Sequence, residues 1–197
     1  MSGFQAGNFF EDFHIGQTLE HGPPRTLTEG DAALYCGLYG ARFAPHAAAT
    51  AARAIGFERS PLDDLLVFHT VFGKSVPDVS LNAVANLGYA ECVFRKPVFA
   101  GATLNARSRV IGLKENANRQ TGVVYVETEG FDDIGASVLR YVRWVMVRKR
   151  SEGSPTPEAS VPKLASAVAP DAIPIPARAL KALPAALATK SLPISCG

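Results

Sequence analysis

Apolar positions before residue 60 recur at helical spacing. Thr28 stands ahead of two acidic residues, and the apolar side chains from Ala32 to Leu38 then repeat every three or four positions. A hydroxyl residue followed by acids caps the positive end of a helix, so the pattern predicts a helix at about 29–39. The alanine-rich stretch 47–55 predicts a second, short helix.

The most apolar segment of the chain follows two acidic residues, Asp63 and Asp64. Almost every residue from Leu65 to Phe72 is hydrophobic, and Gly73 follows the run. Either aspartate can cap a helix that begins here. Because such a helix is apolar on nearly every side, we expect protein to surround it.

Downstream of residue 79 the pattern changes to alternation between apolar and polar positions, which is typical of strands. The predicted strands are 89–95, 103–110, 123–128 and 138–147. Short connections between consecutive strands favour an antiparallel meander. One apolar helix followed by four such strands predicts an α+β hot-dog fold, in which the sheet wraps around the helix. A generic α+β sandwich is the alternative.

Composition narrows the function classes. The chain is 47% hydrophobic and 19% charged, with a net charge of +2, so it is expected to be globular and not a nucleic-acid binder. No apolar run reaches the roughly 20 residues that cross a bilayer, and the amino terminus does not resemble a secretory signal. We therefore expect a cytoplasmic protein. Cys36, Cys92 and Cys196 have no metal-knuckle spacing, and we expect reduced thiols and no metal site.

Aromatic residues and prolines divide the chain near residue 150. The eleven Phe, five Tyr and one Trp all precede that point, whereas the segment after it is rich in proline and alanine. A segment of that composition cannot build a core of its own. We predict one domain at 8–150 and a linker-like, disordered tail at 151–197.

Several segments carry a family resemblance. The stretch from Val93 to Leu104, VFRKPVFAGATL, resembles the strand-turn-strand signature of MaoC-like hydratases, a hot-dog family that acts on coenzyme A (CoA) thioesters. Longer segments, including GNFFEDFHIGQTLEH, PRTLTEGDAALYCGLYGARF and LDDLLVFHTVFGKSVPDVSLNAVANLGYAE, resemble the amino-terminal half of the mesaconyl-CoA hydratase (methylmalyl-CoA dehydratase) family. That resemblance runs from about Gly7 to Arg150.

The resemblance implies reversible hydration of an α,β-unsaturated acyl-CoA of the mesaconyl or methylmalyl type, with no cofactor besides the CoA of the substrate. Members of that branch contain two hot-dog halves, which implies that this chain needs a partner, either a second copy or a second half. Two alternatives remain open. The chain is a non-catalytic half that binds acyl-CoA, or it is a hot-dog acyl-CoA thioesterase.

His46 is the first candidate for catalysis. In the wider family a Gly-Asp-x-Asn-Pro-x-His segment supplies an acid and a base, and here that segment reads GARFAPH, from Gly40 to His46. The aspartate position holds Ala41, so the resemblance implies that His46 acts alone or with a carboxylate such as Asp31. The alternative is a surface or helix-capping histidine.

Further candidates come from the start of the apolar helix and from the segment after it. Asp64 can serve as a base or nucleophile, and the helix end can bind the thioester oxygen, although a plain helix cap explains Asp63 and Asp64 equally well. The resemblance implies substrate binding by Arg42, Phe43, Asp63, Leu65, Asn86 and Gly88. His69 is expected to be a core histidine. The basic cluster at 140–150 is interpreted as a solvated strand end.

Overall fold

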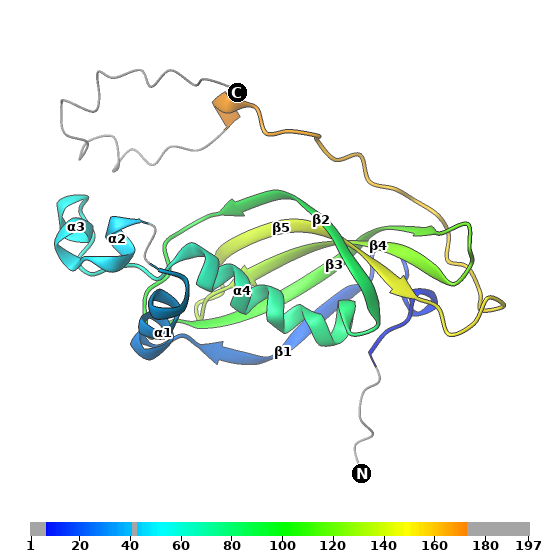
Figure 1. The fold of residues 1–197 in the computed structure, drawn as a ribbon, viewed down its shortest axis with the longest axis horizontal. Coiled ribbons are helices and arrows are strands. Elements are labelled where there is room, and N and C mark those ends of the chain that lie inside the picture. Colours follow the sequence, from blue (N-terminus) through cyan, green and yellow to red (C-terminus); the bar gives the residue numbers. More distant parts are fainter. Residues whose placement is uncertain (1–6, 41–42, 173–197) are drawn as a thin grey trace, which may run out of the picture.

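The computed structural model describes residues 7–40 and 43–172 and shows one five-stranded antiparallel sheet. The strand order is β1-β3-β4-β5-β2, so β1 and β2 form the two edges (Figure 1). The strands are β1 (Thr18–Thr26), β2 (Ala83–Phe94), β3 (Thr103–Glu115), β4 (Thr121–Phe131) and β5 (Ser137–Arg148). The four predicted strands are confirmed and are longer than expected. β1 was not predicted, because Pro23 and Pro24 interrupt its pattern, and an edge strand tolerates proline.

The longest helix lies across one face of this sheet, and the other three lie toward one end of it (Figure 1). The helices are α1 (Glu29–Tyr39), α2 (Ala44–Ala47), α3 (Ala49–Ala54) and α4 (Asp64–Ser75), and short helical turns span Phe10–Asp12, Val76–Ser80 and Pro170–Ala172. A sheet that wraps around one central helix is the hot-dog fold, so that prediction is confirmed. In the described part of the chain no helix is long and apolar enough to cross a membrane.

Buried side chains of α4 join it to the sheet. Leu66, Val67 and Val71 pack with Leu104 of β3 and Tyr141 of β5 in one buried cluster. Burying each such side chain stabilises the fold by about 1.5–3 kcal/mol, so this face of α4 holds the helix on the sheet. Gly73 lies inside α4 and does not end it, because the packing of Val71 and the buried Ser75 continues past that glycine.

The opposite face of α4 is open, which corrects the expectation that protein surrounds this helix. Leu65 is 45% exposed, and His69 and Gly73 are exposed as well. His69 is therefore not a core histidine. Its ring contacts the rings of Tyr35 and Tyr39 on α1, at centroid distances of 5.9 and 6.4 Å. The chain thus leaves an apolar helix face for something else to cover.

The start of the predicted tail is bound to the sheet. Leu113 of β3 and Ser160 exchange two backbone hydrogen bonds of 2.7 and 2.8 Å. Gly112 leaves room for this approach, because a side chain there would clash with the Ser160 carbonyl and with Pro162. The expectation of a disordered tail is wrong for this stretch, since a free edge of β3 supplies hydrogen-bonding partners beyond the end of β1. The boundary at residue 150 stays a prediction.

Candidate active site

His46 is positioned by a backbone carbonyl. It lies on α2, and its Nδ1 atom is 3.1 Å from the carbonyl oxygen of Pro61. A carbonyl oxygen only accepts hydrogen bonds, so Nδ1 is the donor here, and Nε2 keeps its lone pair whenever the imidazole is neutral. Nε2 has no hydrogen-bond partner among the described residues. The ring is thus set to accept a proton through Nε2.

Two carboxylates stand at the start of α4, next to this imidazole. Asp63 caps the helix, and its Oδ1 accepts a hydrogen bond of 2.8 Å from the amide of Leu65. Burial raises the pKa of Asp64, and the nearby imidazole of His46 opposes that rise only in part. The structure therefore brings together His46, Asp63 and Asp64, and it shows that the Leu65 amide already has a partner.

A narrow cavity of about 20 Å³ lies between His46 and the start of α4. Its lining comes from three parts of the chain: Ala32, Tyr35, Cys36, Gly40, His46, Pro61, Leu62, Asp63 and Leu66. A space of this size holds one water molecule, which needs roughly 10–15 Å³, if polar partners are present. His46 and Asp63 offer polar atoms that can serve as partners for this water. The cavity is thus suited to the smaller reactant of a hydration.

Asp31 lies elsewhere and has other partners. Its Oδ2 accepts hydrogen bonds from the amide and hydroxyl of Thr28 at 2.8 and 2.7 Å, and its Oδ1 pairs with Arg25 at 2.8 Å. Hydrogen bonds from Thr28 and the charge of Arg25 lower the pKa of the Asp31 carboxyl. The structure thus places Asp31 in the capping box of α1, where Thr28 is the N-cap, and not beside the imidazole of His46.

The predicted substrate-binding residues are spread over several places. Arg42 lies outside the described residues, as does Ala41. Phe43 is 64% exposed, and its ring meets the ring of His46 edge-on at 6.1 Å. Asn86 is exposed on β2. Gly88 lacks a side chain because the ring of Trp144 fills the space where one would project. Its role in the structure is therefore close packing within the sheet.

A buried histidine, His21, was missed. Its Nδ1 donates a hydrogen bond of 2.6 Å to Asp78 Oδ2, and its Nε2 accepts one of 2.7 Å from Ser108 Oγ. Ser108 Oγ also lies 2.8 Å from the hydroxyl of Thr128. This chain of polar groups ties β1 to the turn after α4 and to two further strands. The partners stand far apart in the sequence, so no local pattern could have revealed them.

The basic cluster at the end of β5 is not a single solvated edge. Arg143 is buried, and its guanidinium donates to Ser75 at 2.9 Å and stacks on Phe72 at 4.6 Å. Lys149 is also buried and pairs with Glu115 at 2.5 Å. Alternation along the strand sends neighbouring cations to opposite faces of the sheet, which spacing in sequence alone does not reveal.

Comparison with known proteins places this chain in a family. The family model described as mesaconyl-CoA hydratase matches residues 2–174. The chain belongs to the mesaconyl-CoA hydratase family. It is 55% identical over 169 residues to a beta-methylmalyl-CoA dehydratase of Chloroflexus aurantiacus, covering 86% of this chain and 47% of that protein. It is 56% identical over 171 residues to a mesaconyl-CoA hydratase of Cereibacter sphaeroides, covering 87% of this chain and 50% of that protein. This member of the family thus spans about half the length of these curated relatives.

Solved structures agree with this placement. A MaoC domain dehydratase of Chloroflexus aurantiacus superposes with a TM-score of 0.85 at 52% identity, over 89% of this chain and 50% of that one. A Mycobacterium tuberculosis protein described as having a double hot-dog fold gives a TM-score of 0.71 at 27% identity, over 87% of this chain and 52% of that one. In both superpositions this family member corresponds to about half of the other chain.

Proposed function

We propose that this chain catalyses the reversible hydration of an enoyl-CoA thioester of the mesaconyl-CoA type, giving a methylmalyl-CoA. The observation that carries the proposal is the imidazole of His46, fixed by the Pro61 carbonyl with Nε2 free, next to a carboxyl group whose pKa is raised. Hydration requires a base for water and an acid for the α-carbon, and these two side chains supply both. The names of the relatives support the choice of acyl group.

In the hydration direction His46 acts as the base. Nε2 removes a proton from the water beside it, and the water oxygen forms a bond to the β-carbon of the thioester. The π electrons of the double bond move toward the thioester carbonyl, which becomes an enolate. The positive end of α4 faces this region and stabilises the developing negative charge. Because Asp63 holds the Leu65 amide, that particular donor serves only if Asp63 releases it.

Asp64 acts as the acid. Its raised pKa keeps a larger fraction of the carboxyl group protonated than an exposed aspartate has at the same pH. The acid transfers its proton to the α-carbon of the enolate, and the proton held by His46 then returns to the Asp64 carboxylate. One water is added across the double bond, and both side chains regain their starting states. No cofactor takes part other than the CoA of the substrate.

The proposal includes a partner, a second hot-dog unit that pairs with the β2 edge. β2 exposes Val84, Leu87, Tyr89 and Val93, which are 39–50% exposed. The other edge, β1, carries two prolines and charged residues that discourage pairing. Because this chain spans about half of its relatives, a second half or a second copy is the occupant that fits.

A second function is favoured by one observation. The position where the wider family carries its acid holds Ala41. In a protein of two halves, one half can bind the acyl-CoA while the other half performs the chemistry. This chain would then bind mesaconyl-CoA and stay inactive until the catalytic half is added.

The test is to mix the purified chain with mesaconyl-CoA and follow the absorbance of the enoyl thioester. Steady loss of absorbance without release of free thiol supports the hydratase. Saturable binding without turnover supports the non-catalytic half, and thiol release supports a thioesterase. Absence of both binding and turnover contradicts all three functions.

The compartment is part of the same proposal. Cys36 and Cys92 are free thiols, as expected of a protein in a reducing environment. We therefore place the enzyme in the cytoplasm. Fractionation of the source cells with an antibody against this chain tests the placement, and recovery in a membrane or extracellular fraction would contradict it.

A further inference from the structure

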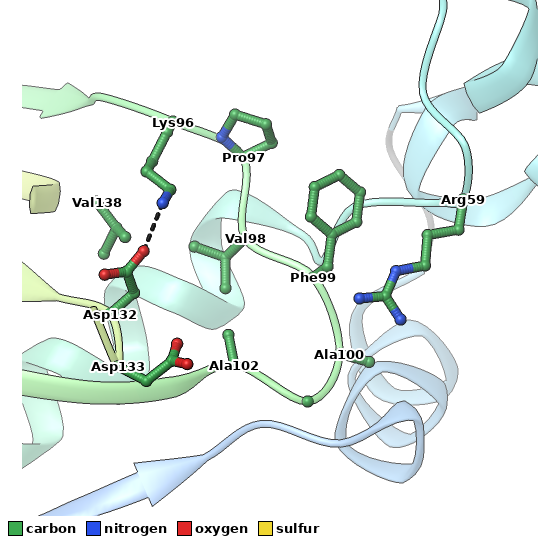
Figure 2. A pocket seen from close by; sticks show the side chains of 11 residues that line it. Arg59, Lys96, Pro97, Val98, Phe99, Ala100, Ala102, Asp132, Asp133 and Val138 are labelled. Carbon is green, nitrogen blue, oxygen red and sulfur yellow. Dashed lines mark hydrogen bonds and ion pairs between the residues drawn. The ribbon is translucent and has the colours of Figure 1, made fainter. Parts of the chain in front are cut away.

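A pocket at the connection between β2 and β3 has no part in the proposed chemistry. We call it the hairpin pocket, and its volume is about 380 Å³. It is lined by residues 96–102 together with Arg59, Asp132, Asp133 and Val138 (Figure 2). Residues 96–102 belong to the VFRKPVFAGATL signature, which the proposed hydration does not use.

One side of the hairpin pocket is cationic and aromatic. The guanidinium of Arg59 lies 5.3 Å from the centre of the Phe99 ring, and the rings of Phe99 and Phe57 meet edge-to-face with their centroids 6.0 Å apart. Arg59 forms no ion pair within the part of the chain that the structure describes. Its donors are thus open to an anion, while the ring holds the guanidinium in place.

The other side of the pocket offers acceptors. Lys96 pairs with Asp132, whose remaining oxygen accepts hydrogen bonds from the amides of Ile134 and Ala136 at 3.2 and 2.8 Å. Asp133, next to it, has no hydrogen bond or ion pair among the described residues. Figure 2 shows Asp133 and Arg59 on opposite sides of the pocket. A phosphate would therefore be repelled at the Asp133 side and attracted at the Arg59 side.

This arrangement fits a ligand with three chemical parts. The guanidinium of Arg59 can bind a phosphate, the ring of Phe99 can pack against a flat ring, and the carboxylate of Asp133 can accept hydrogen bonds. A phosphorylated adenosine has all three, because its amino group and its ribose hydroxyl donate while its phosphate is anionic.

The pocket also stands next to the candidate active site. The amide of Leu62 donates a hydrogen bond of 2.8 Å to the carbonyl of Val98. Leu62 lines the cavity at His46, and Val98 lines the hairpin pocket, so one hydrogen-bonded contact separates the two spaces. CoA carries its phosphorylated adenosine at the far end of a long pantetheine arm, which would connect the two spaces.

We infer that the hairpin pocket binds the 3′-phosphoadenosine end of the acyl-CoA substrate, with Arg59 on the 3′-phosphate. The inference rests on the proposed function, because it takes the substrate to be a CoA thioester. The inference makes Arg59 the residue by which the chain distinguishes CoA from dephospho-CoA, which lacks the 3′-phosphate.

Isothermal titration of the whole chain with CoA, dephospho-CoA and ATP tests the inference. We expect the chain to bind CoA roughly tenfold more tightly than dephospho-CoA, as one charge-assisted contact would give. The variant Arg59→Gln should lose that preference and bind both ligands equally. A preference that survives in Arg59→Gln, or none in the unchanged chain, would overturn the inference. ATP binding as tight as CoA binding would also overturn it, since it would indicate a general nucleotide site.

A matched control is available at Arg107. Its guanidinium stacks on Phe131 at 4.8 Å, as that of Arg59 does on Phe99, but outside the pocket. The variant Arg107→Gln should keep the preference for CoA, and losing it would overturn the inference.

The outcome of this titration is separate from that of the hydration assay. If the preference depends on Arg59 but the chain shows no turnover, the proposed hydratase activity is wrong and the subsite stands. If the chain hydrates the substrate but Arg59→Gln keeps the preference, the subsite is wrong and the hydratase activity stands.

Discussion

The imidazole of His46 and the carbonyl of Pro61, 3.1 Å apart, determine which nitrogen of the ring is free. Pro61 directly precedes Leu62, whose amide is bonded to Val98 in the β2–β3 connection. The carbonyl that orients His46 is thereby held by the β2–β3 connection. A short helix with few contacts of its own can thus present a base in a fixed orientation next to the start of α4.

Asp64 should make stability depend on pH. Its pKa is raised in the folded chain, above the value of about 4 for an unfolded aspartate. Its stabilising contribution is therefore complete below that unfolded value and is lost as the pH rises through the folded pKa. The variant Asp64→Asn does not ionise, so the melting temperature of the variant should rise relative to that of the unchanged chain as the pH increases from about 4 through the folded pKa. A constant difference across that range would contradict the raised pKa.

His21 should give the opposite dependence. Burial lowers its pKa despite the hydrogen bond to Asp78, so the folded chain holds it neutral. Its contribution is present above the unfolded pKa of about 6.5 and is lost as the pH falls from there toward the folded pKa. The melting temperature should drop below that pH, and His21→Gln should remove this part of the drop.

The same variant tests the buried network directly. His21→Gln leaves Asp78 or Ser108 without a well-placed partner, which we expect to cost about 1–3 kcal/mol of unfolding free energy at neutral pH. Urea denaturation measures that loss. An unchanged midpoint would show that the hydrogen bonds of His21 do not stabilise the fold.

A charge on β2 should prevent association with the partner. Leu87 is 43% exposed on this edge strand, and Leu87→Lys places an ammonium group where we expect two apolar surfaces to meet. Sedimentation velocity should show an assembly of two hot-dog units for the unchanged chain and single units for the variant. Ile134→Lys is the control, because Ile134 is 81% exposed and lies in the turn between β4 and β5, outside β2. A monomeric unchanged chain, or a Leu87→Lys variant that still associates, would exclude pairing at β2.

Periodicity in the sequence was sufficient for most of the fold. The buried positions of α4 and the alternation along β3 to β5 follow from local chemistry, and so does the capped α1. β1 could not be predicted in this way, because its pairing with β3 and not its own pattern makes it a strand. The open face of α4 was also missed, since an apolar helix face shows that a cover is needed but not whether the same chain provides it.

The candidate site was only partly predictable. His46, Asp63 and Asp64 were identified as separate candidates, and the structure places them together. Whether they carry the chemistry stays a prediction. The orientation of His46 depends on a carbonyl fifteen positions away along the chain, and the pairing of Asp31 with Arg25 depends on how the end of β1 meets the start of α1. Contacts of this kind form only when loops are folded, so residue type and spacing could not reveal them.

The most direct test of the hydratase is the rate of mesaconyl-CoA hydration by the variant His46→Asn. Asparagine can donate to the Pro61 carbonyl in place of Nδ1 but has no basic nitrogen in place of Nε2. We predict that the variant keeps its melting temperature and loses about 100-fold or more of the hydration rate, which is the usual contribution of a general base. A folded His46→Asn variant that hydrates mesaconyl-CoA at the unchanged rate would contradict the proposed mechanism.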